Sequence, residues 1–210
     1  MPRSTRFWML AATLLLATLY VLPLWHIDLH APQYPEGLGM TIRINTIEGD
    51  TPYDLDNINN LNHYIGMRAI VPDEIPEFRF MPWVLGMLVA LGALTVVVAR
   101  RALIYTWIAG VAAFGVLGLI DFYRWGHDYG HNLDAETAII KIPGMSYQPP
   151  VIGEKQILNF TAASWPDVGT WFALAAVACA LMAVFVARPA AARRAERVRL
   201  TNREPAAARG

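Results

Sequence analysis

The fold is decided by residues 81–120, MPWVLGMLVALGALTVVVA-RR-ALIYTWIAGVAAFGVLGLI. Neither apolar run contains a charged residue, and at about 1.5 Å per residue each is long enough to cross a hydrocarbon core of about 30 Å as a helix. Only Arg100 and Arg101 separate the two runs. The stretch therefore predicts a transmembrane helical hairpin over residues 81–121.

Two further apolar runs, Phe7 to Trp25 and Thr170 to Ala187, have a similar length and also lack charges. The first could be a cleaved signal peptide, but it is longer than the usual apolar region of about 7–15 residues and has no small-x-small cleavage site. We interpret it as a retained anchor. The sequence thus predicts an all-α polytopic membrane protein with four transmembrane helices.

The basic residues are divided unequally between the segments outside these runs. Eleven of the 17 Lys and Arg residues lie in the N-terminus, the 100–101 link and the tail, against two acidic residues there. The long loops hold the other 6 basic and 15 of the 17 acidic residues. Because cytoplasmic segments are enriched in Lys and Arg, we expect both termini in the cytoplasm and both long loops on the other side of the membrane.

The expected organisation has six segments, and the two long loops are expected to form one small α+β extracytoplasmic cap. The loops contain strand patterns at 40–47 and 138–142, and a helix start at Thr51-Pro52 with a stop at Gly66. The segments are an anchor helix (1–25), a first loop (26–80), the hairpin (81–121), a second loop (122–169), a fourth span (170–187) and a disordered basic tail (188–210).

Histidine and methionine side chains gather in the two long loops, and none of the five histidines lies in a span. His127 and His131 are four residues apart, an interval that on a helix puts both side chains on one face. The interval alone is a weak metal signal, but thioether groups favour Cu(I) over harder ions. The candidate copper ligands are His30, Met40, His63, Met67, His127, His131 and Met145.

Each histidine taken singly is more simply explained as a hydrogen-bonded loop residue. His26 is a weaker candidate ligand than the others, because Trp25 beside it suits the membrane interface. The only cysteine, Cys179, lies within a span, so the loops contain no internal disulfide. No serine or cysteine has the neighbours of a catalytic triad, and we expect a protein that is not an enzyme.

Four stretches of the loops resemble a family of bacterial four-span membrane proteins found in gene neighbourhoods for nitrous oxide reductase maturation, which also encode a copper-chaperone lipoprotein. The stretches are HAPQYPEGLGM (30–40), NLNHYIGM (60–67), DFYRWGHDYGHNLD (121–134) and PGMSYQPP (143–150). The resemblance covers most of residues 20–170. It implies a role in copper supply or in the assembly of a periplasmic copper enzyme, and it assigns no catalytic residue.

Two other functions stay open at this point. The cap could be a metal-free scaffold that docks a lipoprotein or a transporter subunit, since an acidic outer face suits a basic partner. The protein could also be a haem-binding subunit of a membrane oxidoreductase, but haem ligands usually lie within facing spans and no span here contains histidine. We expect membrane lipids and a periplasmic copper chaperone or copper enzyme as partners, and no nucleic acid.

Overall fold

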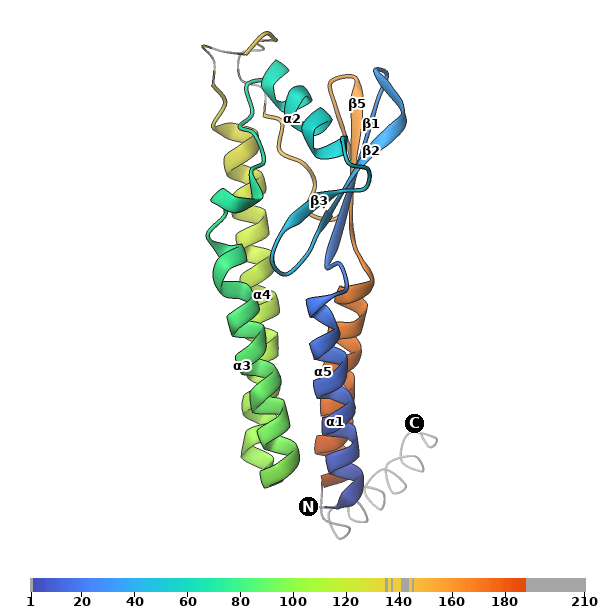
Figure 1. The fold of residues 1–210 in the computed structure, drawn as a ribbon, viewed down its shortest axis with the longest axis vertical. Helices are drawn as coiled ribbons and strands as arrows, with labels where there is room; N and C mark the ends of the chain where they lie inside the picture. The colour runs from blue at the N-terminus through green and yellow to red at the C-terminus, as the bar shows by residue number, and fades with distance from the viewer. Residues whose placement is uncertain (1, 135, 137, 141–143, 145, 188–210) are drawn as a thin grey trace, which may run out of the picture.

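The computed structural model describes residues 2–134, 136, 138–140, 144 and 146–187, and the expected tail 188–210 lies outside them. The molecule is elongated, with a bundle of helices at one end and a β-sheet at the other (Figure 1). The helices are α1 (Arg3–Ala17), α2 (Asp54–Tyr64), α3 (Glu77–Val98), α4 (Arg101–His131) and α5 (Val168–Ala187), with short 3₁₀ turns η1 (Thr18–Tyr20) and η2 (Pro72–Glu74).

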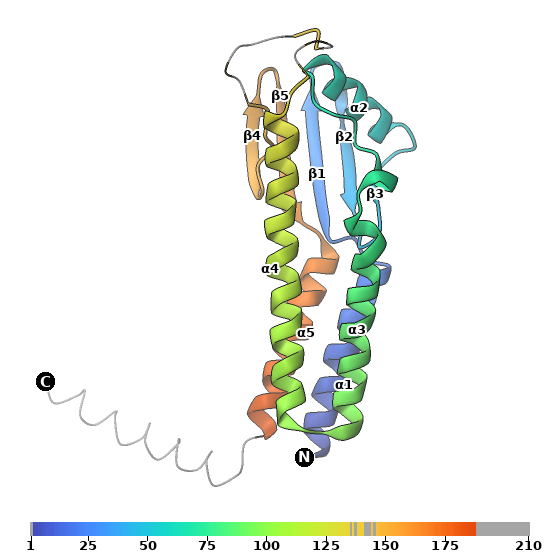
Figure 2. The ribbon, with the colours of Figure 1, turned by 90° about the vertical axis from the view of Figure 1, so that its left-hand side faces the viewer.

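The sheet has five antiparallel strands in the order β3-β2-β1-β5-β4. At its centre, strands from two distant parts of the sequence pair with each other: β1 pairs with β5 from Trp25 opposite Pro166 to His30 opposite Thr161. Strands of both long loops therefore share one sheet beyond the bundle (Figure 2). The strands are β1 (Trp25–Ala31), β2 (Tyr34–Ile42), β3 (Ile47–Gly49), β4 (Gly153–Ile157) and β5 (Phe160–Pro166).

The predicted four-span, all-α fold is wrong. Within the described residues, three helices, α3, α4 and α5, are long and apolar enough to cross a membrane. The first apolar run instead divides between the 15-residue helix α1, the turn η1 and strand β1, which begins at Trp25. Pro23 lies between the turn and the strand, where its missing N–H prevents the helix from continuing. Apolar residues serve a sheet core as well as a span, so composition alone could not separate the two.

The predicted local elements of the loops are only partly present. The helix expected within 51–66 is α2, and Gly66 has the positive φ of 75° expected at its end. The strand expected at 40–47 is divided between β2 and β3. Residues 138–140 are not in a strand, and 141–142 lie outside the described residues. Strands β4 and β5 were not predicted.

Small residues hold α5 close to α1 in the bundle. Ala176, Ala180 and Ala183 are fully buried on α5 and belong to the same core as Met9 and Leu16 of α1. Small side chains at such intervals let two helix backbones approach closely in a membrane. With three helices able to cross a membrane among the described residues, the chain is a multi-pass membrane protein, and α1 packs against α3 and α5 in its bundle.

The outer faces of α3 and α4 expose large apolar side chains, among them Trp83, Val97 and Leu117. Such faces suit contact with lipid tails, because a bundle in a bilayer has no reason to bury its apolar surface from water. By contrast, Trp107 is fully buried between these helices, and its indole N–H donates to Leu88 O at 2.9 Å.

A junction of backbone hydrogen bonds fixes the sheet to the bundle. Gly169 N donates to Pro23 O at 2.7 Å and Asp167 N donates to Leu24 O at 3.0 Å. The Thr170 hydroxyl also donates to Leu24 O, at 2.6 Å. The first N–H groups of a helix have no partner within it, so the start of α5 is satisfied by the residues that lead into β1.

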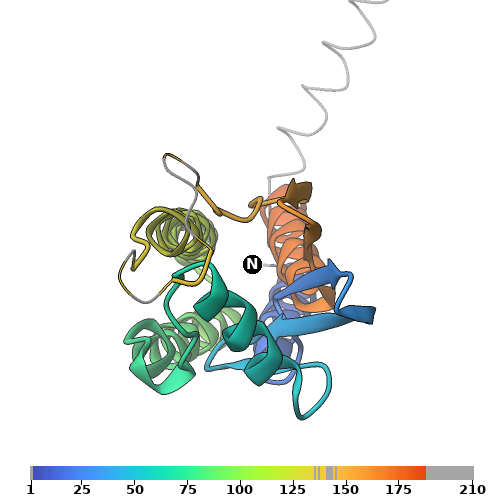
Figure 3. The same ribbon diagram turned by 90° about the horizontal axis from the view of Figure 1, so that it is seen from above.

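Helix α4 continues beyond the apolar run and reaches the sheet. It ends at His131, so the predicted second loop begins with about three further turns of this helix. Its Phe122 ring lies 5.4 Å from the Trp25 ring of β1. Helix α2 covers the same face of the sheet, with Ile58 buried beside Met40 and Leu38 (Figure 3). The sheet therefore has its apolar face toward α2 and α4.

We predict that Gly169→Ala lowers the stability of the protein by roughly 1–3 kcal/mol, the usual cost of overpacking. A Cβ at this position would lie 2.5 Å from Pro23 O. Alanine has a higher helix propensity than glycine, so a loss of stability would come from this close contact. Gly115→Ala is the matched control, because a Cβ there has no neighbour within 4 Å. Thermal unfolding in detergent measures both. A Gly169→Ala protein as stable as the control would contradict the tight junction.

The carboxylate of Asp54 connects α2 to the sheet. It is buried, and it accepts hydrogen bonds from the Thr51 hydroxyl, from Thr51 N at 3.3 Å and from Gly39 N at 3.1 Å. Burial raises the pKa of this carboxyl, but the hydrogen bond from the Thr51 side chain and those from the two N–H groups together lower it below its usual value of 3.8.

A lowered pKa in the folded protein means that Asp54 stabilises the fold when it is ionised. This contribution is complete above the unfolded pKa near 3.8 and is lost as the pH falls through the folded value. We predict that Asp54→Ala lowers the free energy of unfolding by about 1 kcal/mol at neutral pH. The free energy of unfolding of this variant should also fall less steeply than that of the wild type as the pH is lowered. Chemical denaturation at several pH values measures this. Equal acid sensitivity of Asp54→Ala and of the exposed control Asp56→Ala would contradict it.

Candidate functional site

His127 and His131 form a stacked pair at the outer end of α4. Their ring centroids are 3.9 Å apart with an angle of 13° between the planes, and both residues are exposed. His131 Nδ1 lies 2.9 Å from His127 O, a contact that does not involve Nε2 of either ring. The interval of four residues thus places two imidazoles on one helix face, as the sequence predicted, and both face solvent.

The end of α2 lies at the same corner of the molecule. Asp134 N donates to Gly66 O at 2.8 Å, and the N–H groups of Ile139 and Ile140 donate to Tyr64 O at 3.1 and 2.9 Å. His63 is exposed on the last turn of α2, directly before these contacts. Backbone hydrogen bonds therefore hold the helix end that carries His63 against the segment that follows the His127/His131 pair.

The remaining candidate ligands are placed differently. Met40 is 8% exposed in the core between the sheet and α2, and Met67 packs against a neighbouring apolar cluster. His30 is exposed near the end of β1, and it alternates along the strand with the buried Trp25 and Ile27, so it lies on the opposite face of the sheet. Met145 lies outside the described residues. These positions give Met40 and Met67 packing roles and separate His30 from the histidine pair.

Within the described part of the chain, one group of His and carboxylate side chains has ligand atoms mutually close enough for a metal ion, and it consists of His26, Asp28 and Asp50. His26 Nε2 lies 2.9 Å from Asp28 Oδ1 and 3.5 Å from Asp50 Oδ2. Thr41 Oγ1 also contacts His26 Nδ1 at 3.3 Å and donates to Asp50 at 3.0 Å. Oxygen-rich ligands suit harder ions than Cu(I), and the polar contacts within the group already stabilise it on the exposed side of the sheet.

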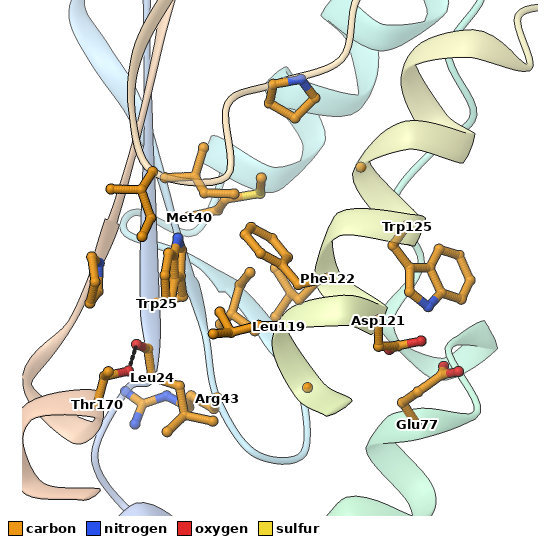
Figure 4. Close-up of a pocket in the computed structure, with 18 of the residues that line it drawn as sticks. Leu24, Trp25, Met40, Arg43, Glu77, Leu119, Asp121, Phe122, Trp125 and Thr170 are labelled. Atoms are coloured by element: carbon orange, nitrogen blue, oxygen red, sulfur yellow. Dashed lines mark hydrogen bonds between the residues drawn. The ribbon is translucent and has the colours of Figure 1, made fainter. Parts of the chain in front are cut away.

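A large apolar cavity lies between the sheet, α2 and the helices of the bundle, and its volume is about 720 Å³. The sheet contributes Trp25, Ile27 and Met40, and α4 contributes Leu119 and Phe122 on the facing wall (Figure 4). The cavity is partly open to the outside. Most of its walls are aliphatic or aromatic.

The few charged groups at the cavity lie where the bundle meets the sheet. Glu77 is the first residue of α3 and Asp121 follows the apolar run of α4, and their side chains point toward each other (Figure 4). Glu77 Oε2 is buried without a hydrogen-bond partner. Arg43 donates to Val21 O at 2.7 Å and to Glu48 at 2.9 Å. These groups mark the level at which the bundle ends and the sheet begins.

A second, smaller hollow of about 290 Å³ lies beside α4. Arg68 forms an ion pair with Asp128, and its guanidinium carbon lies 5.0 Å from the centre of the Tyr129 ring. Trp125 lies 5.6 Å from Tyr129, ring centre to ring centre, and lines the same hollow with Glu74. The aromatic and charged groups here are accessible from one side of the cap.

Neither the cavity nor the group of Arg68, Trp125 and Tyr129 was predicted from the sequence. The cavity had one available signal, because Gly115 and Gly118 on one face of α4 leave open space in front of the helix. The pairing of Arg68 with Asp128 crosses 60 residues of sequence, and no local pattern predicts it.

No model of a known protein family matches the chain, and no curated protein matches it. The resemblance to proteins of nitrous oxide reductase maturation therefore stays a prediction that rests on the four quoted stretches. The geometry of the cap and of the cavity is the remaining basis for a function.

Proposed function

We propose that the protein is a non-catalytic accessory protein of the bacterial cytoplasmic membrane that takes up Cu(I) on the outer side for a periplasmic copper enzyme such as nitrous oxide reductase. The observation that carries this proposal is the exposed, stacked pair of His127 and His131 at the outer end of α4. The uptake site is the corner formed by the ends of α2 and α4.

The imidazole groups of the corner support copper among the metals that suit nitrogen ligands. Neutral imidazole nitrogen is a good ligand for copper, and rotation of the His127 and His131 rings about χ2 can turn both Nε2 atoms toward one ion. His63 is exposed on the last turn of α2, and backbone hydrogen bonds join this helix end to the segment that follows the histidine pair. An open site on the surface suits a protein that receives an ion and passes it on, since a closed ligand cage would retain it.

The distribution of charge supports the proposed orientation. The N-terminus and the α3–α4 link lie at the same end of the bundle (Figure 2), and the link contains Arg100 and Arg101. The sheet end contains most of the acidic residues. Because basic segments remain in the cytoplasm, the basic end of the molecule faces the cytoplasm and the sheet faces the periplasm.

A metal-free scaffold is the second candidate function. It is favoured by the Arg68, Trp125 and Tyr129 group beside α4, because arginine and large aromatic residues are enriched at the centres of protein interfaces. In that case the cap would dock a lipoprotein or a transporter subunit, and Tyr129→Ala would weaken partner binding more than substitutions of the histidine pair.

We predict that the purified protein binds Cu(I) and that His127→Ala combined with His131→Ala weakens this binding at least about tenfold. Even residues that only support a metal ligand contribute about 10–100-fold to affinity, so loss of two ligands should exceed that. Competition with a chromogenic Cu(I) chelator measures the affinity, and mass spectrometry measures the copper content.

His30→Ala is the matched control, because it removes an exposed imidazole from the other side of the sheet and should leave Cu(I) affinity unchanged. Membrane abundance should be equal in all variants, since exposed substitutions rarely change stability by more than about 0.5 kcal/mol. Absence of Cu(I) binding by the wild type, or equal binding by the double variant, would reject the copper proposal and leave the scaffold.

A further inference from the structure

We propose that the cavity between the bundle and the sheet is a binding site for an acyl chain of a membrane phospholipid, which leaves the outer leaflet and inserts between α4 and the apolar face of the sheet. This site is separate from the proposed copper corner and does not depend on it. The occupant is a phospholipid of the surrounding bilayer.

The cavity has the shape of a channel. Along α4 its lining runs from Val111 to Tyr129, which at 1.5 Å per residue is about 27 Å of helix. With a volume of about 720 Å³ along this length of helix, the cavity has room for a flexible hydrocarbon chain.

The channel is continuous from the bundle to the sheet. Its lower part is lined by Val111 of α4 and Val177 of α5, which belong to candidate membrane spans. Its upper part is lined by Ile27 and Ile42 of the sheet, beyond the charged level of Asp121. An acyl chain that enters from the bilayer can therefore pass this level and remain in apolar surroundings.

The walls of the upper part favour hydrocarbon over water. Protein cores rarely contain voids larger than a water molecule, and apolar cavities bind apolar ligands because water finds no hydrogen-bond partners there. The indole N–H of Trp25 is already donated to Ser164 Oγ at 2.8 Å, whereas the Tyr147 hydroxyl, which also lines the cavity, is a buried polar exception without a partner among the described residues. The walls are mostly apolar and therefore suit an acyl chain.

Two glycines of α4 make the site testable. Gly115 and Gly118 both line the channel on the bilayer side of Asp121, and a Cβ at either meets no atom within 4 Å. Gly115→Leu combined with Gly118→Leu places two large side chains in the channel from positions where a Cβ is unobstructed, and it also favours the helix. Ala113→Leu is the matched control, because Ala113 is exposed on the same helix and does not line the channel.

The test uses phosphatidylcholine that carries a photoactivatable diazirine near the end of one acyl chain, with the full-length protein reconstituted in vesicles of phosphatidylcholine. After illumination, mass spectrometry locates the labelled residues. We expect labelling of the inner face of the sheet, at Ile27, Met40 or Ile42, in the wild type and in Ala113→Leu. The glycine double variant should lose this labelling while the outer faces of α3 and α4 stay labelled.

Two results would overturn the proposal. One is labelling confined to the outer faces of the membrane helices in the wild type, and the other is unchanged labelling of the sheet in a double variant whose unfolding midpoint is at or above that of the wild type. If the double variant fails to fold, mass spectrometry of the intact wild-type protein decides, since retention of a phospholipid is expected and its absence overturns the site. Copper affinity is measured separately, so the two proposals can fail independently.

Discussion

The structure depends on the hydrogen-bonded junction between residues 22–25 and 166–170. There the chain passes from α1 into β1 and from β5 into α5, so the two ends of the sequence run side by side from the bundle into the centre of the sheet. The donation from Gly169 N to Pro23 O satisfies a helix start that would otherwise need water. A glycine is required at this close approach, and the close contact fixes how the sheet is placed on the bundle.

Helix α4 connects the two proposed sites. It begins at the basic end of the molecule, forms one wall of the apolar channel and ends at the stacked histidine pair. A channel forms because the junction holds the sheet over α1 and α5, while α4 rises beside the sheet and touches it through Phe122. The copper corner is exposed and polar, whereas the channel is buried and apolar. The same helix thus serves two sites of different chemistry.

The sequence predicted the structural elements that depend on a local pattern of residues. The hairpin of α3 and α4, the last span and α2 follow from apolar runs and from the Thr51-to-Asp54 helix start. The face shared by His127 and His131 follows from their spacing. The sheet could not be predicted in the same way, because Trp25 and Ile27 are as apolar as residues of a span and their β5 partners lie more than a hundred residues away. The channel arises where the sheet, α2 and the helices of the bundle pack around a space, which no single stretch encodes.

Hydrogen exchange at Asp167 and Gly169 in lipid nanodiscs tests the junction most directly. Both amides lie at the start of α5, where an isolated helix would leave them open to water and rapid exchange. With their bonds to Leu24 O and Pro23 O in place, we expect protection comparable to that of the β1–β5 ladder. Exchange as fast as in an exposed loop would contradict a sheet that is fixed to the bundle, and with it the channel between them.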